Sequence, residues 1–170
     1  MNLSTIIIGV VSVALFVVPI LYVQRKQKSR TAKLLSDFLR LGESRQLRVT
    51  KHELWNDCYG IGLDEGQKKL FYVSTRNSNE QQLLVNLLDL KKSTVASVRR
   101  EVNGSKIIDQ VGLRLTPREG KELYLEFYNK EENLNMSGEL QLAEKWNGLI
   151  SGSIAAATVA GTAPERTIPA

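Results

Sequence analysis

The segment KIIDQVGLRLTPREGKELYLEFY, residues 106–128, decides the fold class of this chain. Apolar and polar side chains alternate on both sides of a turn sequence, TPREG, at residues 116–120. Successive side chains of a β-strand point to opposite faces, so a period of two predicts strands with one buried and one solvated face. The residues that share the apolar faces are Ile107, Val111, Leu113 and Leu115 before the turn, and Leu123, Leu125 and Phe127 after it.

The sequence between residue 46 and this segment shows the same period, with turn residues at intervals typical of antiparallel β proteins. Asn103 and Gly104 give the strongest hairpin signal, because this dipeptide favours the tight turns that join neighbouring strands. We therefore predict a mainly β domain with short connections. The seven expected strands cover residues 46–51, 59–64, 69–75, 83–89, 94–102, 106–116 and 121–128.

A helix is expected after the last strand. Ser137 can cap its N-terminus, and Glu139 then lies in the first turn, where negative charge is favoured. Trp146 lies at the centre of the apolar stripe and is predicted to be the core anchor. We place the end of the domain at residue 153 and predict a flexible tail over residues 154–170, into which the helix can extend as far as residue 157. The stripe consists of Leu142, Ala143, Trp146, Leu149 and Ile150.

The first 23 residues are predicted to form a transmembrane helix. Leu3–Val23 is 21 residues long and uncharged, and its helical length of about 31 Å matches an apolar bilayer core of about 30 Å. A cleaved signal peptide is the main alternative, but no basic residue precedes the run, and Tyr22 and Gln24 stand where signal peptidase needs small residues. A buried core helix is disfavoured, because so small a domain cannot cover this apolar length.

Basic residues after the apolar run set the predicted topology. Loops that carry Lys and Arg stay in the cytoplasm, so the N-terminus is expected outside and the domain in the cytoplasm, held by a single pass through the cell membrane. The same residues could contact anionic headgroups, at about 1 kcal/mol for each charge. These interface and topology residues are Arg25, Lys26, Lys28, Arg30 and Lys33.

Residues 24–44 are predicted to be a basic juxtamembrane connector, with a helical pattern from Ser29 to about Leu41 that Gly42 stops. Its apolar residues recur at helical spacing, so we expect it to leave the membrane and pack against the domain. A helix that lies on the membrane surface and a dimerisation seam both remain open. The apolar residues are Leu34, Leu35, Phe38, Leu39 and Leu41.

The charge distribution argues against nucleic acid. Residues 24–48 contain eight basic and two acidic residues, and the rest of the chain contains 15 basic and 16 acidic residues. Nucleic-acid binding needs basic residues clustered on the folded domain, which is close to neutral here. Since Cys58 is the only cysteine, the chain can form no internal disulfide and no thiolate-rich metal site.

No catalytic, cofactor-binding or metal-binding residues are predicted. His52 and Cys58 could form a nucleophilic pair, but no third orienting group or oxyanion site accompanies them in the sequence. Gly60 and Gly62 resemble part of a phosphate loop, yet the remaining spacing and the following helix are missing. We interpret both glycines as strand or bulge residues and expect a protein that is not an enzyme.

The order of seven antiparallel strands and one C-terminal helix with a central tryptophan resembles the pleckstrin-homology-like (PH-like) barrel, in which the helix plugs one open end. The resemblance covers residues 45–153. It implies a seven-stranded barrel that serves as a scaffold or peptide-binding module. The residues that carry it are residues 60–64, 69–73, 111–115 and 122–128 in the strands, and Ala143, Glu144, Lys145 and Trp146 in the helix.

Phosphoinositide-binding members of the PH-like family use basic residues around the first two strands. Here Lys51 and His52 are followed by Glu53, Asn56 and Asp57, which departs from that pattern. We therefore expect a membrane-anchored cytoplasmic adaptor that binds a protein or peptide partner. A module that recognises anionic lipid headgroups is the alternative, and a small membrane-tethered enzyme is a third, of a different class.

Overall fold

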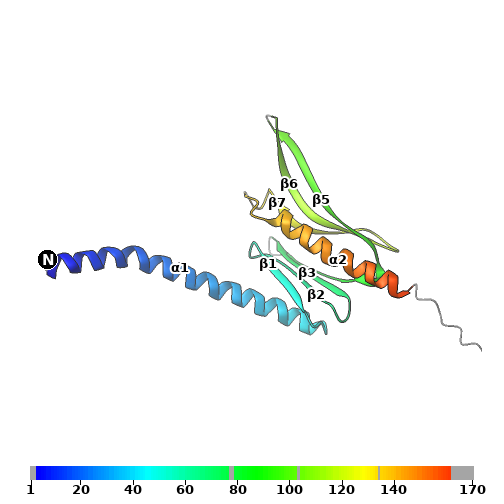
Figure 1. The fold of residues 1–170 in the computed structure, drawn as a ribbon, viewed down its shortest axis with the longest axis horizontal. Helices are drawn as coiled ribbons and strands as arrows, with labels where there is room; N and C mark the ends of the chain where they lie inside the picture. Colours follow the sequence, from blue (N-terminus) through cyan, green and yellow to red (C-terminus); the bar gives the residue numbers. More distant parts are fainter. Residues whose placement is uncertain (1–2, 77–78, 103, 134, 162–170) are drawn as a thin grey trace, which may run out of the picture.

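The computed structural model describes the backbone of residues 3–76, 79–102, 104–133 and 135–161, and their side chains except at positions 3–14, 16, 20, 21, 23–27, 29, 76, 79 and 157–161. Over this part the chain forms two antiparallel sheets and two long helices (Figure 1). The helices are α1 (Leu3–Ser44) and α2 (Glu139–Gly161). The strands are β1 (Lys51–Trp55), β2 (Tyr59–Asp64), β3 (Lys69–Arg76), β4 (Asn79–Asn86), β5 (Leu90–Val102), β6 (Ser105–Pro117) and β7 (Leu123–Asn129), with a 3-10 turn, η1 (Leu87–Asp89), before β5.

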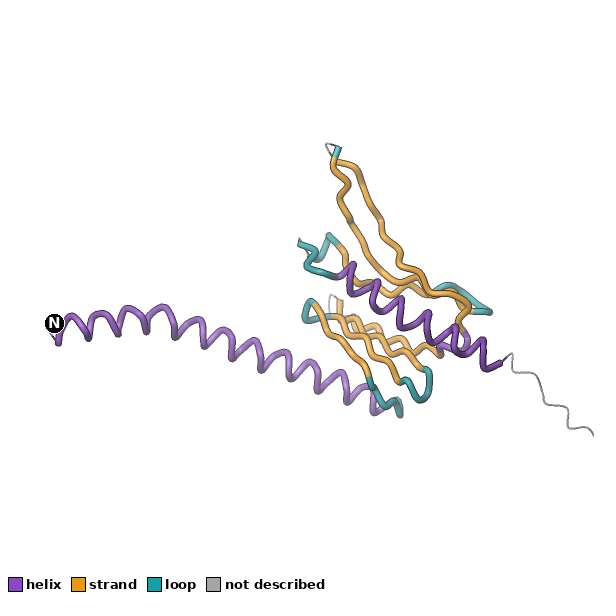
Figure 2. The backbone as a smooth tube through the Cα atoms, viewed as in Figure 1, coloured by secondary structure: helices purple, strands orange, loops and turns teal. Residues whose placement is uncertain are grey.

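The first four strands form one sheet in the order β1-β2-β3-β4, and the last three form a second in the order β5-β6-β7. The prediction of a mainly β domain that ends in a helix is therefore confirmed. Within the described residues no backbone ladder joins β1 to β7 or β4 to β5, so the expected barrel is not closed. The two sheets face each other, and α2 lies between them along one open side (Figure 2).

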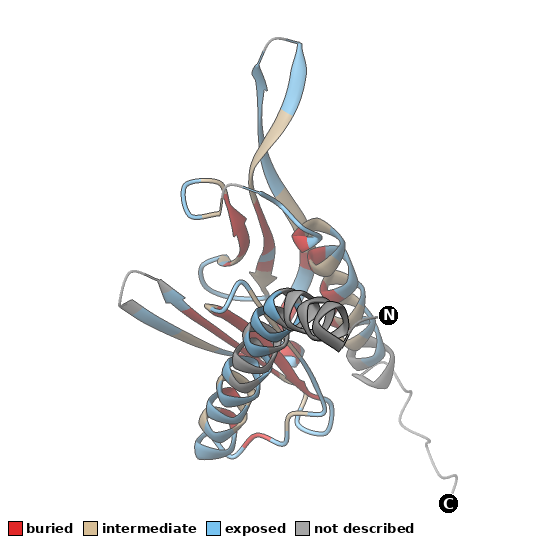
Figure 3. Ribbon diagram, turned by 90° about the vertical axis from the view of Figure 1, so that its left-hand side faces the viewer, coloured by how far each residue is buried: buried red, intermediate tan, exposed pale blue. Residues whose placement is uncertain are grey.

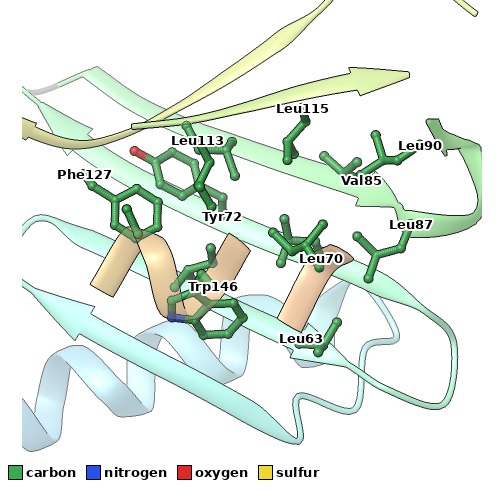
Figure 4. Packing of buried hydrophobic residues seen from close by; sticks show 14 of the residues in the cluster. Leu63, Leu70, Tyr72, Val85, Leu87, Leu90, Leu113, Leu115, Phe127 and Trp146 are labelled. Atoms are coloured by element: carbon green, nitrogen blue, oxygen red, sulfur yellow. The ribbon is translucent and has the colours of Figure 1, made fainter. Parts of the chain in front are cut away.

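The main core lies between the inner faces of the sheets and the apolar stripe of α2 (Figure 4). Trp146, the predicted core anchor, is 1% exposed and packs among side chains of both sheets, including Leu70 and Leu113. Its indole Nε1 is buried, and no described residue accepts a hydrogen bond from it. The stripe continues to Ile154, which is also buried, and α2 extends to Gly161, so the first residues of the tail predicted over residues 154–170 are helical; residues 162–170 lie outside the described part.

Side chains close the side of the domain where β7 approaches the first sheet. The indole Nε1 of Trp55 donates to the carbonyl of Phe127 at 2.8 Å, and the Tyr72 hydroxyl donates to the carbonyl of Glu126 at 2.7 Å. Trp55 also stacks on Phe127, with ring centroids 4.7 Å apart. These side-chain hydrogen bonds satisfy two carbonyls of β7 and join it to the first sheet, a role that ladder hydrogen bonds would have in a closed barrel.

A second, smaller core lies on the outer face of the first sheet, where the C-terminal half of α1 packs. Phe38 is its centre and stacks against Phe71 of β3, with ring centroids 5.3 Å apart. Gly60 and Gly62 of β2 lie beneath the Phe38 ring, so the strand offers no side chain in its way. The predicted packing of the connector helix against the domain is thus observed, and these two glycines are strand residues.

The connector predicted over residues 24–44 is the second half of one continuous helix. No glycine or proline interrupts residues 24–41, and Pro19 is accommodated inside α1. In the part of the chain with described side chains, no helix is long and apolar enough to cross a membrane. The predicted span, Leu3–Val23, falls mostly on positions whose side chains lie outside that part, and it stays a prediction.

The first strand begins later than its alternation predicts, at Lys51 instead of residue 46. Leu47 and Val49 do alternate, but they pack into the Phe38 cluster and not into a ladder. The segment is held instead by two bonds to the end of β2, from the Arg48 amide to the Asp64 carboxylate at 2.7 Å and from the Thr50 amide to the Leu63 carbonyl at 2.8 Å.

Candidate functional site

A groove of about 330 Å³ lies between α1 and the first sheet. One wall is a stripe of α1 that includes Leu34, Phe38 and Leu41, spaced by four and three residues as a helix requires. The other wall is built by the β1–β2 hairpin, with Leu54, and by Val73 of β3. Phe38, which lines the groove, also belongs to the cluster that holds α1 on the sheet.

The rim of this groove is acidic. Asp37 on α1, Asp57 in the β1–β2 turn and Glu80 on β4 are all exposed. No Lys or Arg is among the described lining residues, but Arg30 from the next turn of α1 places its Nε 3.4 Å from the Asp57 carboxylate. The sequence analysis missed Asp37 and Glu80, because nothing in their local sequence brings the two elements together.

Cys58 lies in the wall of the groove and is half-buried. Burial, followed by the charges of Glu132, Asp57 and Glu126, raises the pKa of its thiol to about 11. A thiol with so high a pKa is almost wholly protonated at neutral pH and is a poor nucleophile. His52 pairs with Gly62 in the β1–β2 ladder, three positions or about 10 Å away from the turn end where Cys58 lies, so the fold does not assemble the Cys/His pair.

Behind Cys58, two carboxylates converge on one hydroxyl. The Tyr59 Oη lies 2.8 Å from Oε1 of Glu126 and 3.0 Å from Oε2 of Glu132. Burial, followed by the hydrogen bond and charge of Glu126, raises the pKa of Tyr59. A phenol with one proton cannot donate fully to both carboxylates at once, and the two contacts tie β7 and the following loop to β2.

The hairpin of β5 and β6 projects from the body as a two-stranded arm, which we define as residues 98–102 and 105–108 (Figure 3). β7 pairs with β6 only over residues 110–115, so within the described ladders the arm has strand neighbours on neither outer edge. Val98 is 53% exposed and Val102 is 38% exposed. Arg99, Arg100 and Lys106 outnumber Glu101, which gives the arm a basic character.

The predicted interface residues Lys28, Arg30 and Lys33 are exposed on α1, and the side chains of Arg25 and Lys26 lie outside the described part. Among the described residues, no group of three or more His, Cys, Asp or Glu side chains is arranged so that it could hold a metal ion.

Comparison with known proteins does not supply a function for this arrangement. No family model, no curated protein and no solved structure matches the chain.

Proposed function

We propose that this chain is a membrane-anchored cytoplasmic adaptor, and that its PH-like domain binds an extended segment of a partner protein along the edge of the β5–β6 arm. The arm is the observation that carries the proposal. Its backbone N–H and C=O groups on both outer edges have no strand partner, and an exposed edge is a template for another chain. Exposed Val98 and Val102 supply apolar contacts beside that edge.

The PH-like assignment is supported by the order of the elements. Four antiparallel strands in one sheet are followed by three in a second, and the C-terminal helix with Trp146 at its centre packs on the open side between them. Sheets of this kind present peptide-binding edges without a catalytic centre, which agrees with the unreactive environment of Cys58.

The anchoring is supported by the continuity of α1. One helix runs from the uncharged run at Leu3–Val23 to the Phe38 cluster on the domain, without a break. A domain fixed to its anchor in this way is held in one orientation, and tethering raises the local concentration of any partner in the same membrane.

The lipid-headgroup alternative receives less support from the end of the domain that faces the anchor. The β1–β2 turn and the β7–α2 loop lie at that end (Figure 1). Their charged residues are mostly acidic: Asp57, Glu131, Glu132 and Glu139, with Lys130 as the basic exception. Arg30 contacts Asp57 at this end of the domain and follows Val23 by seven residues, or about 10 Å of helix. This end of the domain would therefore lie within about one Debye length of the headgroups. Anionic lipids would then repel this acidic end of the domain.

Photocrosslinking in native membranes tests the proposal. A benzoylphenylalanine at Val102 of the full-length chain should give one discrete adduct of protein size. The same group at Lys121, in the exposed turn between β6 and β7, should not. Equal adducts from both positions, or an adduct of lipid size from the arm, would contradict the adaptor function.

A further inference from the structure

The groove between α1 and the first sheet has the properties of a second docking site. Its two walls contribute the apolar side chains of Leu34, Leu54 and Val73, which together we call its floor. Its volume of about 330 Å³ falls at the lower end of pockets that hold small ligands, which is enough for one or two large side chains.

Charge indicates what the groove would accept. Asp37, Asp57 and Glu80 surround an apolar floor, and the described lining contains no basic side chain to neutralise them. Arg30 of the chain's own basic segment already approaches Asp57 to 3.4 Å, so the rim receives a cationic side chain within the molecule. An occupant with an apolar centre and flanking positive charges is complementary to both features.

The distance of the groove from the membrane further restricts which peptides could bind in it. If Leu3–Val23 spans the membrane, as the proposed function requires, Thr31 at the groove is eight residues beyond the span, or about 12 Å along α1. Peptide segments found at this depth on the cytoplasmic side are the ends of other membrane helices, and these are rich in Lys and Arg.

We propose that the groove binds the basic juxtamembrane segment of another membrane protein, with one large apolar side chain on the floor and Lys or Arg at Asp37 and Glu80. This inference rests on the anchored state in the proposed function but does not use the β5–β6 arm.

Cys58 provides a built-in reporter, because it is the only cysteine of the chain and lies in the groove wall. The test uses the full-length chain, one copy in each phosphatidylcholine nanodisc, and measures the rate of Cys58 alkylation by a water-soluble maleimide. The probes are two peptides with the same apolar centre, GKRLFKRG and GEELFEEG. At ten times its dissociation constant, a bound basic peptide should slow alkylation about tenfold. The acidic peptide should leave the rate unchanged.

Variants then test the rim. The double variant Asp37→Asn with Glu80→Gln should weaken protection by GKRLFKRG about three- to tenfold, because two exposed charge pairs are lost. Glu119→Gln, which removes an exposed carboxylate in the turn between β6 and β7, away from the groove and the arm, should not change it. The inference is overturned if both peptides protect equally, if neither protects, or if the double variant behaves as the parent.

Two other occupants have distinct outcomes. Slower alkylation without peptide in nanodiscs that hold two copies would assign the groove to a second copy of this chain and overturn the proposal. If neither peptide protects but the Val102 crosslink still captures a protein, the groove inference fails while the adaptor function stands.

Discussion

Phe38 and Gly60 are in direct contact across the interface of α1 with β2. A Cβ at position 60 would lie 2.8 Å from Cδ2 and 2.9 Å from Cε2 of the Phe38 ring, which is closer than side chains approach in proteins. The absence of a side chain on one strand residue therefore lets the helix dock, and it fixes the direction in which α1 leaves the domain.

Gly60→Ala should destabilise the protein by about 1–3 kcal/mol, because the buried Phe38 ring or α1 must shift to admit the methyl group. Thermal unfolding of the full-length chain in detergent measures the effect. Gly148→Ala is the matched control: this glycine lies in α2 with nothing within 4 Å of its would-be Cβ, so the change should stabilise by about 0.5–1 kcal/mol.

Combining Gly60→Ala with Phe38→Leu should cost less than the two single changes together, since the smaller side chain relieves the contact. Strict additivity would show that the two residues do not meet across this interface.

The indole N–H groups of the two tryptophans differ in their hydrogen bonding, so replacing each tryptophan with phenylalanine should have a different cost in stability. Trp146 Nε1 is buried and no described residue accepts a hydrogen bond from it, whereas Trp55 Nε1 donates to the Phe127 carbonyl. Trp146→Phe loses packing volume but removes an unsatisfied donor, so its cost should stay below about 2 kcal/mol, against about 3–5 kcal/mol for Trp146→Ala. Denaturant unfolding of each variant measures this. A loss for Trp146→Phe as large as that for Trp146→Ala would indicate that the N–H has a partner.

Trp55→Phe should lower stability by about 1–2 kcal/mol, because a carbonyl at the junction of β7 with the first sheet loses its donor. The near-ultraviolet signal of Phe127 and Tyr59, which flank the indole, should change with it.

Periodicity in the sequence predicts those parts of the fold whose side chains face one core. β6, β7 and α2 each bury a regular stripe, and Trp146 lies where its spacing places it. The stretch around Leu47 was assigned incorrectly to a strand, since apolar residues that pack on a helix can alternate as those of a strand do. The groove could not be predicted, because Asp37 and Glu80 are 43 residues apart and meet only through the docking of Phe38.

Cys58 should titrate far above an ordinary thiol. Its alkylation rate should still be rising at pH 10, with a midpoint near the pKa of about 11. After burial, the charge of Glu132 is the largest cause that raises this pKa, so Glu132→Gln should move the midpoint down. Alkylation followed by mass spectrometry in folded protein measures both. Glu101→Gln serves as the control, and a midpoint near 9 in the parent chain would show that the thiol is neither buried nor close to these carboxylates.

Asp64 should make stability depend on acid pH. Burial favours its neutral form, but the amides of Gln67, Arg48 and Gly66 and the charge of Lys69 outweigh this and lower the pKa of Asp64 below 3.8. A carboxyl group whose pKa is lower in the folded state contributes stability above its unfolded pKa, and this stability is lost as the pH falls through the folded pKa. Asp64→Asn should therefore cost about 1–3 kcal/mol of unfolding free energy at pH 7, and the difference from the parent should shrink below about pH 4.

Denaturant unfolding between pH 7 and pH 3 tests this prediction for Asp64, with Asp57→Asn as control. Among the described residues, Asp57 forms an exposed ion pair with Arg30, and the loss of this pair should cost less than about 1 kcal/mol. Equal costs for the two variants, or an Asp64→Asn difference that stays constant with pH, would rule out a charged carboxylate that holds the end of β2 to the Arg48 segment.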